Sequence, residues 1–282
     1  MDALSPFATP KTPTFAPVLG KKAPRQTMSL LTLDIGNTRT KAGLFRQGSL
    51  ADRQVWAGLS PDQVLTYGRS QGVEAAMICS VAEPDGQLLE RMRAAWPTWE
   101  LTHETPLPFV NAYRTPQTLG KDRLAAAAGA QALWPGEACV VVDCGTCIKY
   151  EWVEADGTYR GGNIAPGLHM RIRAMHEFTA RLPQVPMEMP DSPVGHSTET
   201  ALQNGALRGA ALEIAGFVRL LEEGAGGAAR VVLTGGDADF LRPHLRLERL
   251  TVQPDLVLYG LHHLLAHQLT SSASGATAAR PS

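Results

Sequence analysis

The sequence predicts an α/β protein with two similar lobes that face each other across a cleft. An apolar strand ending in Asp-x-Gly occurs twice, at residues 31–36 and 140–145, and a return strand follows each copy. Each copy also opens a half of the chain in which strand-like and helical segments are mixed, a pattern typical of α/β folds. Because one copy could arise by chance and two are less easily explained that way, the repeat indicates duplicated lobes.

Composition limits the classes of function. Hydrophobic residues make up 44% and charged residues 19% of the 282 residues, which is an ordinary globular balance. The formal net charge is −1 and no long basic run occurs, so we expect no nucleic-acid partner. No apolar stretch approaches the roughly 18 residues of a membrane helix, so we expect no membrane association. Four cysteines are too few for a disulfide scaffold, which favours a reducing, cytoplasmic location.

The first lobe is predicted to span residues 28–138, after an N-terminal extension at 1–27 that is rich in proline and predicted to be disordered. A strand, a Gly-Asn turn and a second strand predict a hairpin at its start. The alanine-rich segment 119–133 is strongly helical and ends at Pro135-Gly136. The predicted elements of this lobe are strands at 29–34, 40–45 and 75–79 and helices at 86–95 and 119–133.

The second lobe is predicted to span residues 139–270, followed by a tail at 271–282 whose Ser, Ala and Gly content favours disorder. Its strand-turn-strand unit repeats the pattern of the first lobe. A proline at position 183 is expected to end the helix that precedes it. The predicted elements are strands at 139–142, 148–153 and 231–233 and helices at 170–182, 205–223 and 256–269.

The two Asp-x-Gly hairpins together predict a phosphate-binding site. Glycine in a tight turn lets the backbone approach a ligand closely, and the N–H groups of such a turn form an anion-binding concavity. Asp34 and Asp143 end the paired strands, where each carboxylate can hold a cation beside the phosphates. A single such turn is ordinary hairpin chemistry, so the argument depends on the pair. Neither the P-loop nor the G-x-G-x-x-G pattern is present.

Four further segments give the pattern its specificity. They lie in order at residues 113–123 (YRTPQTLGKDR), 161–167 (GGNIAPG), 178–183 (FTARLP) and 233–238 (LTGGDA). With the two hairpins, this ordered set resembles the type III pantothenate kinases, which belong to the actin-like ATPase superfamily together with the sugar kinases. The resemblance implies two actin-like (ribonuclease H-like) lobes with a nucleotide in the cleft between them.

The resemblance also implies a reaction, cofactors and site residues. The reaction is ATP-dependent phosphorylation of pantothenate to 4′-phosphopantothenate, the first step of coenzyme A synthesis, in a homodimer with shared active sites. The implied cofactors are ATP, Mg²⁺ and a monovalent cation (K⁺ or NH₄⁺) bound by Asp143, and Asp122 is the implied catalytic proton acceptor. The implied ATP-binding residues are Asp34, Ile35, Gly36, Asn37, Thr38, Arg39, Thr40, Lys41, Thr146, Gly235 and Gly236. The implied substrate-binding residues are Tyr113, Gly120, Lys121, Asp122, Arg123 and, from the second subunit, Thr198, with Thr200 as its alternative.

Several interpretations stay open at this point. Asp122 begins a helix, where a carboxylate also stabilises the first turn without any role in catalysis. Arg123 is expected either to orient that carboxylate or to contact an anionic substrate. Lys149 departs from the commonest family pattern, and a solvated strand position is favoured over a phosphate contact. The chain could instead phosphorylate another small alcohol, or it could be a nucleotide-binding regulatory or accessory protein.

Overall fold

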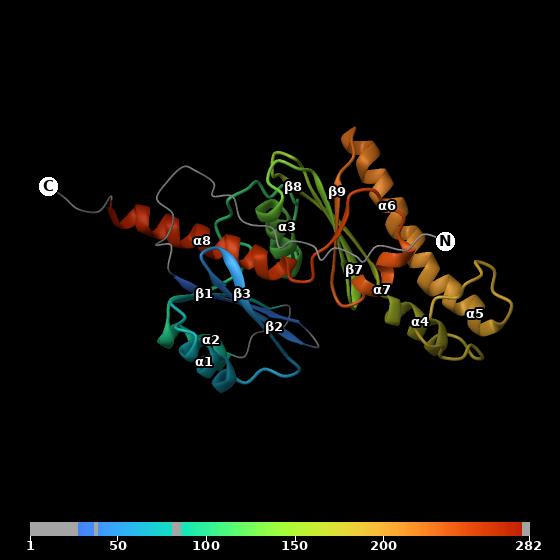
Figure 1. Cartoon of the computed structure of the whole chain (residues 1–282), viewed down its shortest axis with the longest axis horizontal. Coiled ribbons are helices and arrows are strands. Elements are labelled where there is room, and N and C mark those ends of the chain that lie inside the picture. The colour runs from blue at the N-terminus through green and yellow to red at the C-terminus, as the bar shows by residue number, and fades with distance from the viewer. Residues whose placement is uncertain (1–27, 37–38, 81–85, 278–282) are drawn as a thin grey trace, which may run out of the picture.

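The computed structural model describes residues 28–36, 39–80 and 86–277, so the predicted extension at 1–27, Asn37 and Thr38 lie outside the described residues. Two five-stranded sheets and their helices form two lobes (Figure 1), which confirms the predicted α/β two-lobe class. In the described part of the chain, no helix has the length and apolar character needed to cross a membrane.

Both lobes have the same strand order, which confirms the repeat. The first sheet is ordered β3-β2-β1-β4-β5, and the second, read from the equivalent edge, is ordered β8-β7-β6-β9-β10. In each sheet the first three strands form an antiparallel meander, and the last two run parallel to the first strand. The first-lobe strands are β1 (Ser29–Ile35), β2 (Thr40–Arg46), β3 (Ser49–Trp56), β4 (Ala75–Ser80) and β5 (Thr98–Glu100); the second-lobe strands are β6 (Cys139–Cys144), β7 (Cys147–Val153), β8 (Tyr159–Pro166), β9 (Arg230–Thr234) and β10 (Leu250–Val252).

Two helices fill the space between the sheets. They are α3 (Lys121–Leu133) and α8 (Leu256–Thr277), which share one hydrophobic core with residues from both sheets (Figure 1). Helix α8, which the sequence analysis assigned to the second lobe, packs on α3 and on β1, β2 and β4. Each lobe has a further core on its outer side, formed with α1 (Pro61–Ser70) and α2 (Gly86–Ala95) in the first lobe.

The remaining helices cover the outer face of the second sheet. They are α4 (Leu168–Glu177), α5 (Thr198–Gln203), α6 (Gly209–Ala225) and the short α7 (Ala238–Leu241). A turn of π-helix at Asn204–Arg208 joins α5 to α6, so the helix predicted to begin at residue 205 begins at Thr198. The Ser197 hydroxyl caps it, accepting a hydrogen bond from the Thr200 N–H.

Two predicted helix ends are wrong. Helix α4 ends at Glu177 and not at residue 182, because the Thr179 hydroxyl donates to the Met175 carbonyl and His176 bonds to the Leu182 carbonyl. Such local bonds compete with the helical ladder. Helix α8 continues to Thr277, so residues 271–277 are helical and not part of a disordered tail. Alanine and serine are compatible with a helix, and the first proline comes only at Pro281.

Candidate active site

A cleft of about 640 Å³ lies where the two hairpins meet the start of α3. Nine of the predicted site residues line it, and seven other residues line it as well. The predicted ones are Asp34, Gly36, Tyr113, Gly120, Lys121, Asp122, Arg123, Asp143 and Thr146; the others are Ser80, Thr118, Leu119, Cys147, Lys149, Ile164 and Val257.

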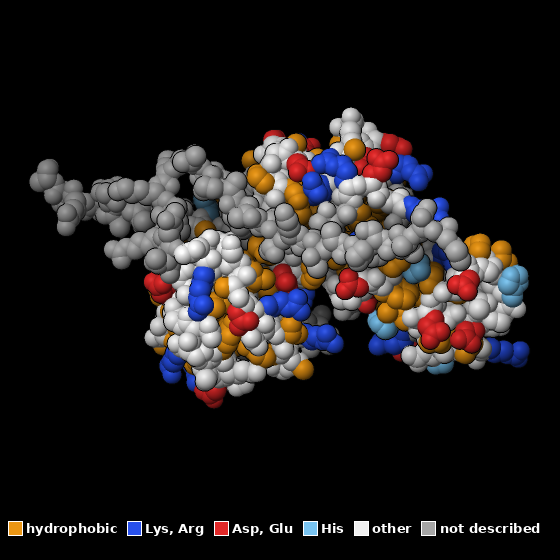
Figure 2. Space-filling view, in the orientation of Figure 1, with side chains coloured by type: hydrophobic (Ala, Val, Ile, Leu, Met, Phe, Trp, Pro, Cys, Tyr) orange, Lys and Arg blue, Asp and Glu red, His pale blue; other side chains and the backbone are white. Residues whose placement is uncertain are grey.

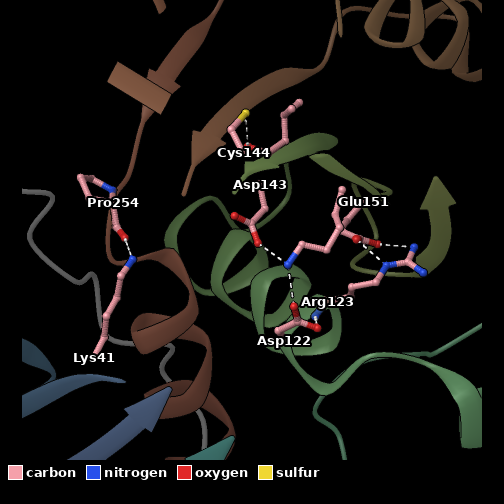
Figure 3. A network of polar contacts seen from close by, with 9 residues as sticks. Lys41, Asp122, Arg123, Asp143, Cys144, Glu151 and Pro254 are labelled. Atoms are coloured by element: carbon pink, nitrogen blue, oxygen red, sulfur yellow. Dashed lines mark hydrogen bonds and ion pairs between the residues drawn. The ribbon is translucent and has the colours of Figure 1, made fainter. Parts of the chain in front are cut away.

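The first hairpin brings Asp34 into the cleft at the end of β1. Its turn is closed by a hydrogen bond from the Gly36 N–H to the Arg39 carbonyl at 3.1 Å. Burial raises the pKa of Asp34 to about 6; Lys41 opposes this shift, and the Asp143 and Asp122 carboxylates add to it. The Lys41 ammonium donates to the Pro254 carbonyl at 3.1 Å (Figure 3). The predicted residues Ile35, Arg39, Thr40 and Lys41 do not line the cleft.

The second hairpin places Asp143 and Thr146 in the same cleft. The Gly145 N–H closes this turn on the Cys147 carbonyl at 3.1 Å. Gly235 lies against the hairpin with φ +92°, and a Cβ there would lie 2.6 Å from Asp143 Oδ1 and 2.2 Å from the Cys144 carbonyl oxygen. Only glycine is compatible with this position. Gly235 therefore packs against the hairpin, and neither Gly235 nor Gly236 lines the cleft itself.

Asp122 stands at the start of α3, facing the second hairpin. One carboxylate oxygen accepts a hydrogen bond from the Arg123 backbone N–H at 2.9 Å. A Cβ on Gly120, two residues earlier, would lie 2.7 Å from the same oxygen, so glycine makes room for this arrangement. Lys121 turns aside and pairs with Glu100 at 2.9 Å. In Figure 3 the Asp122 and Asp143 carboxylates point toward each other.

Lys149 lies between these two carboxylates, which corrects the sequence-based preference for a solvated strand position. Its Nζ is 2.6 Å from Asp122 Oδ2 and 2.7 Å from Asp143 Oδ2, and its side chain is 19% exposed. Burial alone would lower the pKa of this ammonium, but the Asp143 and Asp122 carboxylates raise it above its ordinary value. Lys149 is the cross-strand partner of Asp143, as Lys41 is of Asp34. A comparison of the two hairpin registers would have revealed it from the sequence.

Arg123 plays a different part from either predicted one. Its guanidinium is 5% exposed and makes a bidentate ion pair with Glu151, with nitrogen–oxygen distances of 2.6 and 2.9 Å. Figure 3 shows the side chain running away from Asp122 toward Glu151, whose carboxylate also accepts from the Tyr159 hydroxyl at 2.6 Å. Arg123 contacts the Asp122 carboxylate through its backbone N–H and not through its guanidinium.

Tyr113 completes the wall of the cleft on this side. The Arg123 guanidinium lies over its ring at 5.5 Å, and the ring stacks with that of Tyr159 at a centroid distance of 6.4 Å. Gly161 has φ +101°, and a Cβ there would lie 2.7 Å from the Tyr113 ring. Gly161, the first glycine of the 161–167 segment, therefore lets Tyr113 and β8 pack closely.

Thr198 does not line this cleft. It is the first residue of α5, is exposed, and makes no hydrogen bond through its hydroxyl within the described part of the chain. By contrast, the Thr200 hydroxyl accepts from the His196 and Ser197 N–H groups at 3.0 Å each and is committed to the helix cap. Of the two threonines, Thr198 is the one with a hydroxyl free to reach another molecule.

The sequence profile of the type III pantothenate kinases matches residues 30–220 of this chain. Curated relatives with the name type III pantothenate kinase include those of Phocaeicola vulgatus, 38% identical over 84% of this chain and 98% of the relative, and Bacteroides fragilis, 39% identical over 83% and 96%.

Solved structures share the fold. A Campylobacter jejuni protein described as a Baf family transcriptional activator aligns with a TM-score of 0.56 at 23% identity, covering 85% of this chain and 98% of that one. A Listeria monocytogenes protein described as an N-acetylmannosamine kinase aligns with a TM-score of 0.51 at 13% identity, covering 86% and 100%. At these identities the likeness concerns the fold alone.

Proposed function

The chain belongs to the type III pantothenate kinase family, and we propose that the cleft between its two hairpins is where it transfers the γ-phosphoryl group of ATP to pantothenate. The chain is thus a kinase of coenzyme A biosynthesis. One observation carries the assignment of the site: Asp34, Asp122 and Asp143 come from three separate segments and line one cleft beside two hairpin turns. Phosphoryl transfer depends mainly on positioning and on charge stabilisation, and this arrangement supplies both.

Asp122 is proposed to accept the proton of the pantothenate hydroxyl. Each of its oxygens accepts one hydrogen bond in the structure, from the Arg123 N–H and from Lys149. A carboxylate oxygen can accept two, so the contacts that position the group leave it able to take up a proton. The carboxylate lies in the first turn of a 13-residue helix, where a negative charge interacts favourably with the helix dipole.

The hairpin backbones are proposed to hold the ATP phosphates. Gly36 and Gly145 offer turns without a Cβ, and Thr146 is exposed to the cleft with a hydroxyl donor. Gly235 and Gly236 follow β9 and are proposed to border the adenosine. Lys41 would reach the nucleotide only after leaving its present acceptor, the Pro254 carbonyl.

Asp34 is the residue that would hold a divalent cation beside the phosphates. Its carboxylate faces the cleft and has no hydrogen-bonded partner among the described residues. Mg²⁺ is commonly held by one or two carboxylates together with phosphates and water. We therefore propose that Asp34 holds Mg²⁺, directly or through a bound water, and that the ion supplies charge neutralisation at the phosphates.

The predicted monovalent cation at Asp143 does not fit the described donor set. Asp143 Oδ2 already contacts the Lys149 ammonium at 2.7 Å, and Oδ1 faces the backbone of Gly235. A second cation on this carboxylate would lie close to the ammonium and be repelled by it. No step of the proposed reaction is assigned to such an ion.

We also propose a cytoplasmic homodimer in which Thr198 reaches the partner's substrate. Apolar side chains are exposed on the part that carries α4 to α6 (Figure 2), and such surfaces favour protein contacts. Phe178 is 85% exposed, and Leu212 and Leu220, which are 68% and 64% exposed, lie on one face of α6.

A coupled ADP-release assay with ATP, Mg²⁺ and pantothenate tests the reaction and the base together. We expect pantothenate-dependent turnover in the wild type. In Asp122→Asn we expect kcat to fall by about 10²- to 10⁴-fold, because the general base is lost, while binding of ATP persists. Asp62→Asn is the matched control, since Asp62 occupies the same first-turn position of α1 and is 79% exposed. Near-normal turnover by folded Asp122→Asn would show that Asp122 is not the base.

A further inference from the structure

The Lys149 ammonium occupies the centre of the catalytic cleft as a fixed positive charge. It bridges Asp122 and Asp143, which come from different elements and face each other. Without it, these two carboxylates and Asp34 would line one partly buried cleft, where like charges repel strongly. A positive charge is therefore required at this point, and the chain supplies it from its own β7 strand.

The position of this ammonium is set by the sheet and does not depend on a flexible loop. Lys149 lies directly across from Asp143 in the β6–β7 register, and cross-strand neighbours of opposite charge stabilise each other. Its flanking residues Ile148 and Tyr150 are fully buried on the other face of the strand. The strand is thus held so that the Lys149 side chain emerges toward the cleft.

Resting on the proposed function, we infer that the Lys149 ammonium takes the place of a monovalent cation at Asp143, so that phosphoryl transfer by this chain requires neither potassium nor ammonium ion. Lysine carries a compact charge with three N–H donors. Two of them point to the Asp122 and Asp143 oxygens at distances that leave no room for a separate ion between those atoms. The third donor has no acceptor among the described residues and is available to a phosphate oxygen.

The wild-type chain provides the first test, independent of any effect on folding. Pantothenate-dependent turnover is measured with Mg²⁺-ATP in tetramethylammonium, sodium, potassium and ammonium chlorides at equal ionic strength, which keeps screening constant. We expect rates within about twofold of one another, a difference of less than 1 kcal/mol in barrier. Turnover that is strictly dependent on potassium or ammonium would overturn the inference and leave the proposed function intact. Absence of turnover in every salt would instead contradict the proposed function.

Two substitutions separate the charge of Lys149 from its volume. Lys149→Ala removes the charge and leaves space, whereas Lys149→Met removes the charge and fills the space. In tetramethylammonium we expect both to lose about 100-fold in kcat, the usual scale for an electrostatic group in a catalytic site. Potassium or ammonium should restore turnover in Lys149→Ala and fail to do so in Lys149→Met. Arg160→Gln, which removes an exposed cation of the neighbouring β8 strand, is the matched control and should behave as the wild type.

Thermal unfolding gives a readout without catalysis. A cation that binds only the folded state raises Tm, so potassium should raise the Tm of Lys149→Ala relative to tetramethylammonium and leave those of the wild type and Lys149→Met unchanged. If a folded Lys149→Ala variant shows no change in Tm or in turnover when potassium is added, the inference that the Lys149 ammonium replaces a monovalent cation is wrong. Full activity of Lys149→Ala in tetramethylammonium would overturn it as well.

Discussion

Charged side chains that are buried in this chain have partners that match them in geometry. Arg123 and Glu151 are almost fully buried and form a two-bond ion pair that the Tyr159 hydroxyl completes. Replacing only one partner would leave an uncompensated buried charge, which costs about 3–5 kcal/mol. His262 and His263 on α8 differ from this ion pair, because burial lowers the pKa of each to about 4 and so favours the neutral form.

The buried histidines predict a loss of stability in weak acid. The unfolded chain binds protons at His262 from about pH 6.5, whereas the folded chain does so only near pH 4. The free energy of unfolding therefore falls as the pH is lowered through this window. His262→Phe, which keeps a ring stacked on Phe45, should reduce the difference between pH 7 and pH 5 by about 2 kcal/mol relative to the wild type.

Urea unfolding at the two pH values measures this effect. The comparison is made between variant and wild type because Asp34, with a pKa raised to about 6, changes stability in the opposite direction over part of the window. His103→Gln serves as the control, since the side chain of His103 is 44% exposed. If the free energy of unfolding of His262→Phe depends on pH as that of the wild type does, His262 is not the cause of the loss of stability in weak acid.

Helices α3 and α8 cross at close range, and glycine allows it. A Cβ on Gly129 of α3 would lie 2.2 Å from the Leu256 carbonyl oxygen, and one on Gly260 of α8 would lie 1.8 Å from the Ala125 carbonyl oxygen. Both contacts are with backbone atoms, which cannot rotate aside as a side chain can. Because α3 carries Asp122 at its first turn, the crossing also fixes the position of the proposed base.

The crossing predicts an effect of Gly260→Ala that is opposite to the usual one in a helix. Alanine normally stabilises a helix relative to glycine, but here we expect destabilisation by about 1–3 kcal/mol through overpacking. Gly224→Ala on α6 is the matched control, because nothing lies within 4 Å of its added Cβ, and it should stabilise by about 0.5 kcal/mol. Chemical denaturation measures the free energy of unfolding of both variants. Equal changes in the two variants would contradict the close packing of α3 and α8 at Gly260.

Both lobes of the molecule contribute residues to the site. Asp34 belongs to the first sheet, Asp143 and Lys149 belong to the second, and Asp122 lies on the helix between them. Figure 2 shows Lys and Arg side chains interspersed with Asp and Glu over the visible surface, as the net charge of −1 leads one to expect. The exposed apolar residues near α4 to α6 are the part of this surface proposed for dimerisation.

The proposed dimer can be tested by combining two defective subunits. In a heterodimer of Asp122→Asn with Thr198→Ala, one of the two sites receives both wild-type residues if Thr198 acts in the partner's site. We therefore expect about half of the wild-type turnover from heterodimers purified through two different tags, as the two-fold symmetry dictates. If the residues act within one chain, the heterodimer should show only the mean of the two parent homodimers.

Local signals in the sequence were sufficient for the repeat, the hairpins, the alanine-rich helix and the family resemblance. The predicted elements depend on apolar strand segments, on Asp-x-Gly turns and on helix propensity, which act over a few neighbouring residues. The family resemblance depends on the order of the motifs along the chain. Strands β3, β5, β8 and β10 were not predicted, because they are short, exposed or rich in glycine and are recruited by pairing with neighbours. The end of α4 likewise depends on side chains that bond back to its last turn.

The residue types at the ends of the paired strands and at the start of α3 could be predicted from the sequence, since they follow from local turn and helix chemistry. Which of these residues meet depends on the tertiary fold. Lys149 was expected at a solvated strand position, yet its ammonium bridges Asp122 and Asp143. Arg123 stands next to Asp122 in the chain, yet its guanidinium is buried against Glu151. Ion pairs of this kind depend on the register and packing of segments far apart in sequence, and burial determines which charges must be matched.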